Sequence, residues 1–310
     1  MLQHHGIIDH PALSPVQQQE YDPNTGQLIA YPRLCSTGIF NDPNDLCLIL
    51  NLGIVCCLYH AVTGNGAFSS LAWLTPVGLF GYAIVLTKSR GGLLGLMAAL
   101  AAYLVARFGW RRALPAIVLG APLALLALGG RQANISLGNS DTAYTRVMLW
   151  AEGISTLLGS MRNWFTGIGA GRFAEEMGLV AHNSFVHAYV ELGLLGGSLF
   201  LVAFVTAARM LHRLSALPQS AVPPALRYFP PMLLAMLVGY CGGMYSLSRN
   251  YVVPTYLCLG LADAYLAMAI AEPPDEFRLS RTWIKQAIFL GVGGLIFLKL
   301  FTQVFGSLGQ

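Results

Sequence analysis

The sequence predicts an all-α, polytopic membrane protein with about eight transmembrane helices, because apolar residues dominate it and its few charges leave long uncharged stretches. Of 310 residues, 55% are hydrophobic and only 10% are charged, and the mean hydropathy is +0.59. A soluble domain has about a quarter charged residues, so this chain lacks the polar surface of a soluble globule. No Asp, Glu, Lys or Arg occurs from Leu46 to Thr87, and further uncharged stretches are 91–106, 113–130, 228–248 and 286–298.

The predicted spans follow from the length that a bilayer requires. A helix crosses it with about 20 mostly apolar residues, and a helical backbone satisfies its own hydrogen bonds in lipid. The stretch from Leu46 to Thr87 holds two spans, separated by the turn sequence Thr63-Gly64-Asn65-Gly66. The seventh span carries Asp263, which is either a transport carboxylate or a group that reaches water or a neighbour. The expected spans are 46–63, 69–87, 91–107, 113–130, 184–207, 229–248, 250–270 and 284–303.

These spans divide the chain into five parts. They are an exterior segment of residues 1–45, four spans in 46–130, an exterior loop of residues 131–183, four spans in 184–303, and a tail of residues 304–310. The first segment is polar and rich in turn residues, and no hydrophobic segment precedes it. We therefore expect it to be the remnant of a longer protein, or the result of a misplaced start.

Orientation follows from Lys and Arg, which are in excess in short cytoplasmic loops. The outward short loops carry three of these residues, namely Lys88, Arg90 and Arg249. The opposite short loops carry nine, which are Arg107, Arg111, Arg112, Arg209, Arg213, Arg227, Arg278, Arg281 and Lys285. This bias predicts that residues 131–183 lie outside, which in a bacterium means the periplasmic face of the inner membrane.

The sequence indicates no metal or cofactor. Five of the six cysteines lie in predicted spans, and neither a metal-type cysteine pair nor a nucleotide-binding glycine motif is present. Gly91-Gly92 and the glycines of 193–197 favour close packing of helices. The net charge of +4 reflects the loop arginines that set the topology, so nucleic-acid binding is not indicated.

The residues suited to chemistry lie in the exterior loop and at the start of the fifth span. Apolar residues at helical spacing predict an amphipathic helix from Thr142 to Met161, capped by Asp141 or Thr142, with Arg146 in its first turns. The following segment, 167–173, is either a close-approach binding loop or a plain glycine-rich turn.

A polar stripe opens the fifth span. Asn183, His187 and Glu191 are four residues apart and share one helix face, an arrangement that in a membrane usually marks a functional cavity. A structural interpretation is that Asn183 caps the helix and His187 pairs with Glu191. We favour the structural interpretation for His187 and Glu191, and a functional one for His182, which is an available base at the membrane boundary.

Lys88 and Arg90 stand in a short outward turn, where the topology disfavours cations. They either neutralise lipid headgroups or bind an anionic substrate. The planar guanidinium of arginine donates two hydrogen bonds at once to phosphate. If Arg90 and Arg146 converge, they form a pyrophosphate clamp.

Four segments of the chain together resemble the O-antigen ligase and O-antigen polymerase superfamily. They occur in the family's order and cover most of residues 38–200. The segments are 38–46 (GIFNDPNDL), 89–94 (SRGGLL), the group of Arg146, Trp150 and 167–173 (GIGAGRF), and 182–185 (HNSF) followed by 191–196 (ELGLLG).

This resemblance implies a GT-C-like helical bundle that acts as a metal-independent, inverting membrane glycosyltransferase. Family members move a glycan from an undecaprenyl-diphosphate carrier to a saccharide, a lipid A-core or, in some members, a protein hydroxyl, at the periplasmic face. By position, Arg90 and Arg146 match the arginines that bind the diphosphate, and His182 matches a histidine near the acceptor. Arg172 matches a less constant position, and the remaining supporting candidates are Lys88, Asn183, His187 and Glu191. Family members commonly have more spans than predicted here, which puts the completeness of the carrier groove in doubt.

The implied mechanism is chemically consistent. Fixed arginines stabilise the charge that develops on the leaving diphosphate, and His182 removes the proton of the acceptor hydroxyl or orients it. A polymerase of the same superfamily would use the same residues. Two hypotheses of a different class stay open. The first is a transporter or flippase of anionic lipid-linked glycans, which predicts paired charges at mid-membrane and internal repeats, and the second is a non-catalytic scaffold.

Overall fold

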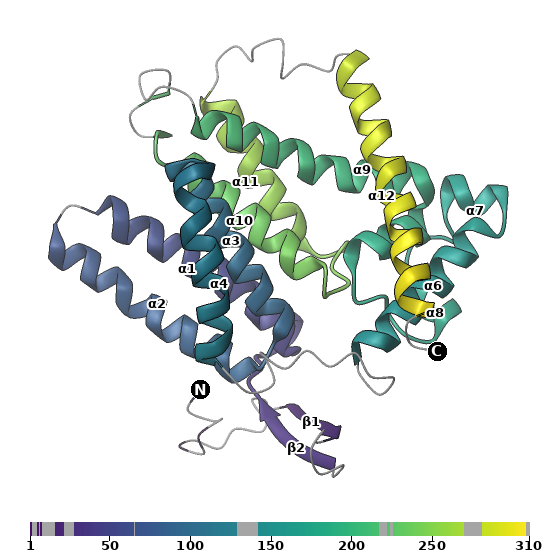
Figure 1. The fold of residues 1–310 in the computed structure, drawn as a ribbon, viewed down its shortest axis with the longest axis horizontal. Coiled ribbons are helices and arrows are strands. Elements are labelled where there is room, and N and C mark those ends of the chain that lie inside the picture. Colours follow the sequence, from purple (N-terminus) through teal and green to yellow (C-terminus); the bar gives the residue numbers. More distant parts are fainter. Residues whose placement is uncertain are drawn as a thin grey trace. The chain divides into compact units, whose positions relative to one another are not determined.

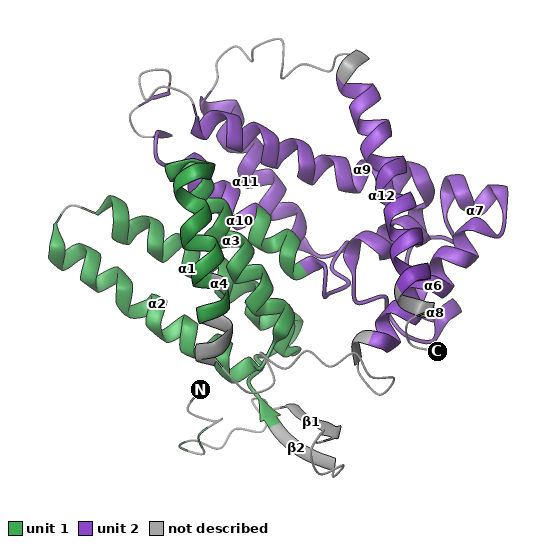
Figure 2. Ribbon diagram, viewed as in Figure 1, with its two compact units in different colours: residues 1–134, 238–243 green, residues 135–237, 244–310 purple. Residues whose placement is uncertain are grey.

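A computed structural model describes residues 16–21, 28–64, 66–128, 142–216, 222–223, 226–269 and 281–307, with the single residues 1, 5 and 7. It is 82% helical, with eleven helices in this part of the chain, as the composition predicts (Figure 1). The chain forms two units (Figure 2). Unit 1 is residues 1–134 and 238–243, and unit 2 is residues 135–237 and 244–310.

Unit 1 begins with a hairpin that the turn-rich N-terminal sequence did not predict. Strand β1 (Val16–Tyr21) pairs antiparallel with β2 (Leu28–Arg33), and Val16 lies opposite Arg33. A short 3-10 helix, η2 (Gly38–Phe40), follows. The hairpin leads into the first long helix.

Four helices of unit 1 correspond to the first four predicted spans: α1 (Pro43–Thr63), α2 (Ala67–Thr87), α3 (Arg90–Phe108) and α4 (Trp110–Leu128). Their ends follow local chemistry. The Asp42 carboxylate accepts a hydrogen bond from the Asn44 N–H at the start of α1, beside Pro43 at the first helical position. The Ser89 hydroxyl caps α3 in the same way by accepting from the Gly92 N–H.

Glycines allow the helices of unit 1 to pack closely, as the sequence predicts. A Cβ at Gly92 would lie 2.5 Å from the Cys47 Sγ, and one at Gly239 would lie 2.6 Å from the Ala99 Cβ. Gly239 belongs to α10 (Phe229–Met244), whose residues 238–243 are part of unit 1. The buried Asn51 also donates a hydrogen bond to the Gly92 carbonyl at 2.9 Å.

Unit 2 contains α6 (Thr142–Leu158), α7 (Met161–Thr166), α8 (Phe173–Met177), α9 (Ser184–Ser215), α11 (Val253–Ala269) and α12 (Arg281–Ser307). The single helix expected over 142–161 ends at Leu158, because Ser160 caps a new helix, α7, by accepting from the Asn163 N–H at 3.1 Å. The proposed cap Asp141 lies outside the described residues.

The core of unit 2 joins α6, α8, α9 and α12. Its buried side chains include Trp150, Leu157, Phe173, Tyr189 and Leu295. The Tyr189 hydroxyl donates to the Gly291 carbonyl at 2.8 Å. This core fixes the helices that surround the candidate site described below.

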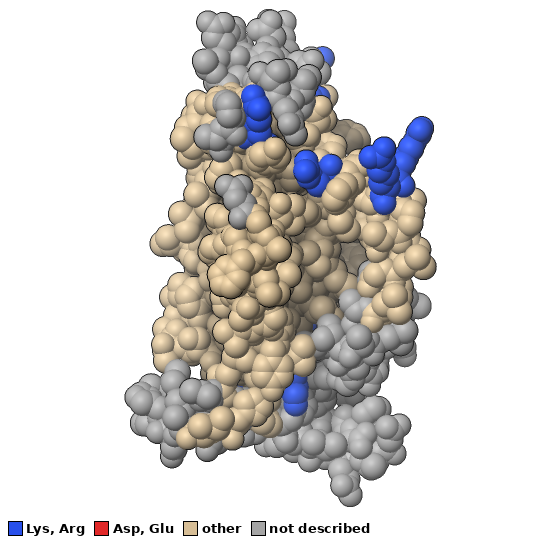
Figure 3. Space-filling model, turned by 90° about the vertical axis from the view of Figure 1, so that its left-hand side faces the viewer, with Lys and Arg blue, Asp and Glu red and all other residues tan. Residues whose placement is uncertain are grey.

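Five described helices are long and apolar enough to cross a membrane: α1, α2, α3, α9 and the 283–304 part of α12. Helices α10 and α11 are apolar but have only 16 and 17 residues. A described helix therefore covers most of each predicted span, but the structure does not confirm the count of eight. Large apolar side chains such as Phe68 (88% exposed) and Phe289 (77% exposed) need a lipid environment. Figure 3 shows one face of the molecule on which the described residues carry few Lys or Arg side chains and no visible Asp or Glu.

Candidate functional site

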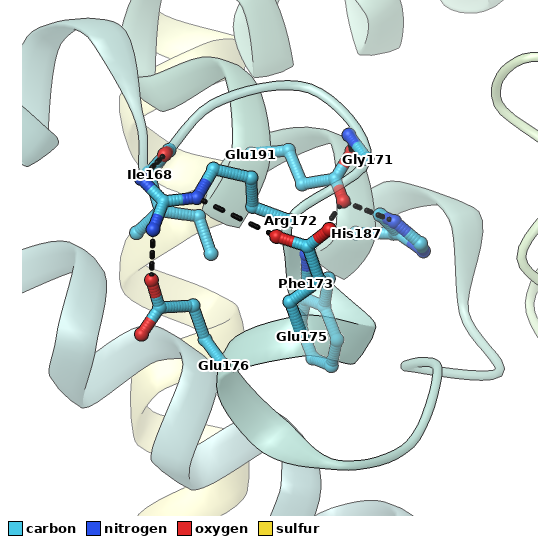
Figure 4. Close-up of polar contacts among 8 residues, drawn as sticks. All are labelled: Ile168, Gly171, Arg172, Phe173, Glu175, Glu176, His187 and Glu191. Carbon is cyan, nitrogen blue, oxygen red and sulfur yellow. Dashed lines mark hydrogen bonds and ion pairs between the residues drawn. The ribbon is translucent and has the colours of Figure 1, made fainter.

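The centre of the candidate site in unit 2 is the carboxylate of Glu191, which is fully buried on α9. It accepts hydrogen bonds from the backbone N–H of Gly171 at 2.9 Å and of Phe173 at 2.8 Å. The His187 Nε2 lies 2.8 Å from the same carboxylate, and Tyr251 supplies a further side-chain hydrogen bond. Figure 4 shows the carboxylate between this backbone segment and the His187 ring.

Residues 167–173, called the glycine loop below, are also bound to the backbone of α9. The Ile168 N–H donates to the Val190 carbonyl and the Gly169 N–H to the Glu191 carbonyl, both at 3.0 Å. These carbonyls face the loop because α9 is interrupted at Gly193, which has φ 71° and ψ −171°. A break in the helix removes the regular i to i+4 donors, so the freed carbonyls need new partners.

Two of the glycines are required by this arrangement. A Cβ at Gly167 would lie 2.2 Å from the Glu191 carbonyl oxygen, and one at Gly193 would lie 2.3 Å from the Phe165 carbonyl oxygen. Both glycines also have positive φ, which L side chains disfavour. The glycine loop is therefore an ordered part of the site.

The electrostatic setting of Glu191 is that of a buried anion surrounded by donors. Tyr251 lies outside the spanning helices and is 48% exposed. Partial burial, followed by the Glu191 carboxylate, raises the pKa of this phenol, which therefore remains a donor at neutral pH. The His187 ring lies 5.1 Å from the Phe173 ring and 6.2 Å from the Tyr251 ring between centroids. His187 and Glu191 thus form the structural pair that the sequence favoured.

The start of α9 is fixed by polar side chains. The Asn183 Oδ1 accepts from the N–H groups of Phe185 and Val186, which confirms the predicted cap. The Ser184 hydroxyl donates to the Leu247 carbonyl at 2.6 Å and accepts from the Arg249 N–H at 2.8 Å. The segment between α10 and α11 therefore lies against the first turn of α9.

Two buried amides near this junction keep an unused donor group. The side chain of Asn183 is fully buried and that of Asn250 is 2% exposed. Within the part of the chain that the structure describes, the Nδ2 atoms of both have no hydrogen-bond partner. Buried amide N–H groups without an acceptor are costly.

Arg146 lies on α6, one turn before Trp150 and on the same helix face. The Trp150 indole donates to the Ala181 carbonyl at 2.5 Å, so this face of α6 meets the segment that carries His182. Arg146 and His182 therefore belong to the same region of unit 2.

Lys88 and Arg90 belong to unit 1, at the turn between α2 and α3. Arg33 holds this turn through its Nε, which donates to the Thr87 carbonyl at 2.7 Å, and through its Nη2, which donates to the Asn44 Oδ1 at 3.2 Å. The Ser89 hydroxyl donates to the same Asn44 Oδ1 at 2.6 Å. The segments 38–46 and 89–94 are thus in direct contact.

Arg172 is the candidate that the structure turns away from the site centre. Its side chain is 55% exposed, and its guanidinium pairs with Glu176 at 2.6 Å and with Glu175 at 3.9 Å. Figure 4 shows it directed to Glu176, away from the Glu191 carboxylate. An exposed pair of this kind contributes little to stability.

Sequence reasoning missed Arg33, Asn250 and Tyr251. It singled out the segments that carry Asn44, Gly171 and Phe173, but not the contacts of these three residues. The sequence did offer one signal. The carboxylate of Glu191 lies inside an apolar helix and must therefore accept hydrogen bonds from several donors. The backbone donors of the glycine loop and the long-range contacts of Arg33 and Asn44 leave no periodic pattern. Among the described residues, no group of three His, Cys, Asp or Glu side chains gathers to hold a metal ion.

The chain matches no protein-family model, no curated protein and no solved structure.

Proposed function

We propose that this protein is a membrane glycosyltransferase of the O-antigen ligase and polymerase type. It transfers a glycan from an undecaprenyl-diphosphate carrier to a saccharide or lipid A-core acceptor at the periplasmic face. The observation that carries the proposal is the pairing of the segments that resemble this superfamily. Segment 38–46 contacts 89–94 through Asn44 and Ser89, and the glycine loop contacts 191–196 through the Glu191 carboxylate.

Backbone conformation gives independent support. Lys88 (φ 51°) and His182 (φ 49°) are the non-glycine residues with positive φ among those described. Both belong to segments proposed for chemistry on sequence grounds. Such conformations are sparsely populated and concentrate at functional sites. Lys88 has this conformation as the C-cap of α2, so His182 is the outlier that favours a function for the turn that presents it.

The proposed roles follow from side-chain chemistry. Arg90 and Arg146 bind the donor diphosphate, because guanidinium groups form paired, charge-assisted hydrogen bonds with phosphate oxygens. As the glycosyl bond breaks, the diphosphate leaves with the bonding electron pair and the arginines stabilise its charge. His182 accepts the proton of the acceptor hydroxyl, whose oxygen attacks the anomeric carbon from the opposite side and inverts it.

Glu191 and His187 act as positioning residues in this proposal. They hold the glycine loop and the first turns of α9, and so support the segment that carries His182.

A polymerase that joins repeat units would use the same groups, so it is the second candidate function. The transporter hypothesis gains no such support. Asp263 lies on an exposed position of α11, and the buried Glu191 is occupied by donors of its own unit.

The test measures glycan transfer in purified membranes supplied with a lipid-diphosphate-linked glycan. We expect transfer by the wild type and a loss of at least about 100-fold in Arg90→Ala, Arg146→Ala and His182→Ala, the scale of a removed electrostatic or acid–base group. Arg111→Ala, in a loop predicted to be cytoplasmic, is the matched arginine control and should retain transfer. Equal amounts of inserted protein must be shown for each variant. Transfer by all three variants at the wild-type rate contradicts the proposal.

A further inference from the structure

The turn between α2 and α3 is very short. Lys88 and Ser89 alone join α2, which ends at Thr87, to α3, which begins at Arg90. Lys88 has φ 51° and ψ 32°, the left-handed conformation, and its N–H donates to the Val85 carbonyl at 3.1 Å. A left-handed residue other than glycine needs surrounding contacts that hold it in place. The direction in which α3 presents Arg90 therefore depends on what holds this turn.

The end of α2 is capped by residues that follow directly on the hairpin. The Leu34 N–H donates to the Leu86 carbonyl at 3.0 Å, and the Arg33 Nε donates to the Thr87 carbonyl at 2.7 Å. The last carbonyls of a helix have no partner within the helix, and a cation suits that end of the helix dipole. Residues 33–34 therefore supply the partners that the end of α2 requires.

The start of α3 is capped by Ser89, and Asn44 orients this cap. The Ser89 hydroxyl accepts from the Gly92 N–H at 3.0 Å and donates to the Asn44 Oδ1 at 2.6 Å. A serine hydroxyl has one hydrogen to donate, so the bond to Asn44 fixes the rotation in which a lone pair faces the Gly92 N–H. Ser89 is fully buried, so Asn44 rather than bulk water receives its hydrogen.

The two caps converge on a single atom. The Asn44 Oδ1 accepts from the Arg33 Nη2 at 3.2 Å and from the Ser89 hydroxyl at 2.6 Å. An amide oxygen has two lone pairs, so these donors use both. The backbone of Asn44 is held in turn at the start of α1, where its N–H donates to the Asp42 carboxylate at 2.7 Å. Asn44 thus connects α1, the end of α2 and the start of α3 around the turn that carries Arg90.

We propose that Asn44 is a positioning residue of the donor site, whose amide oxygen holds the α2–α3 turn in the conformation in which Arg90 meets the diphosphate. This inference rests on the proposed function of Arg90, and Asn44 acts through Arg90 without contacting the donor. Ser89 transmits the effect, because it is bonded to Asn44 and directly precedes Arg90. Without the Asn44 oxygen the turn loosens, and the guanidinium samples orientations in which its paired hydrogen bonds to phosphate do not form together.

The test is a double-mutant cycle of donor affinity, measured on the full chain in detergent with the lipid-diphosphate-linked glycan. Arg90→Ala should weaken donor binding by about 100-fold, and Asn44→Ala by about ten-fold. When Asn44→Ala is added to Arg90→Ala, it should weaken binding by less than about two-fold, because it acts through the guanidinium that is already missing. A merely structural loss would weaken binding equally in both backgrounds.

A second variant breaks the same link from the other side. Ser89→Ala removes the hydroxyl that Asn44 holds, so it should also weaken donor binding by about ten-fold. The double variant Asn44→Ala/Ser89→Ala should bind the donor as Ser89→Ala alone does, since both changes break one hydrogen bond. If Asn44→Ala does not fold, the cycle of Ser89→Ala with Arg90→Ala makes the same comparison.

Thr63→Ala is the matched control. The Thr63 hydroxyl donates to the Tyr59 carbonyl at 2.8 Å at the opposite end of α1. Its removal deletes a side-chain hydrogen bond of the same unit, away from the turn, and should leave donor affinity at the wild-type value.

Two results would overturn the inference and leave the proposed function intact, provided that Arg90→Ala weakens donor binding. They are wild-type donor affinity in both Asn44→Ala and Ser89→Ala, and an effect of these variants that is equally large with and without the Arg90 guanidinium. Wild-type donor affinity in Arg90→Ala would instead reject the proposed role of Arg90, and the positioning role of Asn44 with it.

Discussion

The backbones of Gly167 and Gly193 are in direct contact, so the glycine loop packs against α9 at the residue where that helix is interrupted. A Cβ added to Gly167 would lie 2.6 Å from the backbone nitrogen of Gly193, and one added to Gly193 would lie 2.6 Å from the backbone nitrogen of Gly167. Both residues have positive φ, 73° and 71°. This contact turns the Val190 and Glu191 carbonyls toward the loop and brings the Glu191 carboxylate under the loop N–H groups.

Gly193→Ala should lower the unfolding free energy by about 3 kcal/mol or more, because it combines a disfavoured φ with a backbone clash. Gly178→Ala, which has φ 77° and nothing within 4 Å of its added Cβ, should lose only about 1–2 kcal/mol. Gly78→Ala lies in α2 in open space and should be neutral or slightly stabilising. Denaturant titration in detergent measures the order, and equal effects at all three sites would contradict it.

Glu191→Gln should release the glycine loop. The neutral amide loses the charge that holds His187 and the two backbone donors, and its NH2 group meets N–H groups without an acceptor. Removing one member of a buried charged network costs about 3–5 kcal/mol. Hydrogen exchange measured on peptides covering 168–177 should become much faster at Gly171 and Phe173.

Glu176→Gln is the matched control for this change. It breaks the pair with Arg172, whose side chain is 55% exposed, and should change stability by no more than about 1 kcal/mol. If both variants leave the exchange of the glycine loop unchanged, the carboxylate does not organise it.

Ser89→Ala should open the contact between segments 38–46 and 89–94. The variant removes the cap of α3 and the hydrogen bond to Asn44, with an expected loss of about 1–2 kcal/mol. Cys47 is fully buried, with its Sγ 2.8 Å from the Thr87 hydroxyl, so its maleimide labelling should accelerate. Ser160→Ala removes an equivalent cap in unit 2 and should leave Cys47 protected. Identical labelling rates in the two variants would contradict a specific role of Ser89 in this contact.

Arg33 and Arg172, which have no role in the proposed chemistry, should contribute very differently to stability. Arg33 is 7% exposed and holds the Thr87 carbonyl and the Asn44 side chain. Arg33→Ala should therefore cost about 2–3 kcal/mol. Arg172→Ala should cost less than about 1 kcal/mol, because its partners are exposed carboxylates. Thermal unfolding of both variants provides the comparison, and a larger loss for Arg172→Ala would contradict the assigned contacts.

The sequence predicted the helices well because each long apolar stretch has only one stable conformation in lipid. The predicted ends agree less well. Asn183 caps α9 at Ser184 as expected, but α9 continues to Ser215 rather than to residue 207, and α10 ends at Met244 rather than at residue 248. The pairing of His187 with Glu191 was predictable from their spacing of four residues.

The parts of the fold and of the site that the sequence did not predict depend on contacts that leave no periodic pattern. The break of α9 at Gly193 became evident only where the glycine loop approaches it. Ser160 could have been recognised as a cap, but the apolar periodicity continues across it and favoured one helix to Met161. The hydrogen bonds of Arg33 to residues 44 and 87 join distant parts of the chain, so composition and spacing could not indicate them.

In the proposed mechanism, Arg90 and Arg146 bind the donor diphosphate while His182 acts on the acceptor. The most direct test measures donor binding and glycan transfer separately in the three alanine variants. We predict that Arg90→Ala and Arg146→Ala weaken donor binding and abolish transfer, and that His182→Ala binds the donor as the wild type does but transfers no glycan. Loss of donor binding in His182→Ala, or normal transfer in either arginine variant, would contradict this assignment.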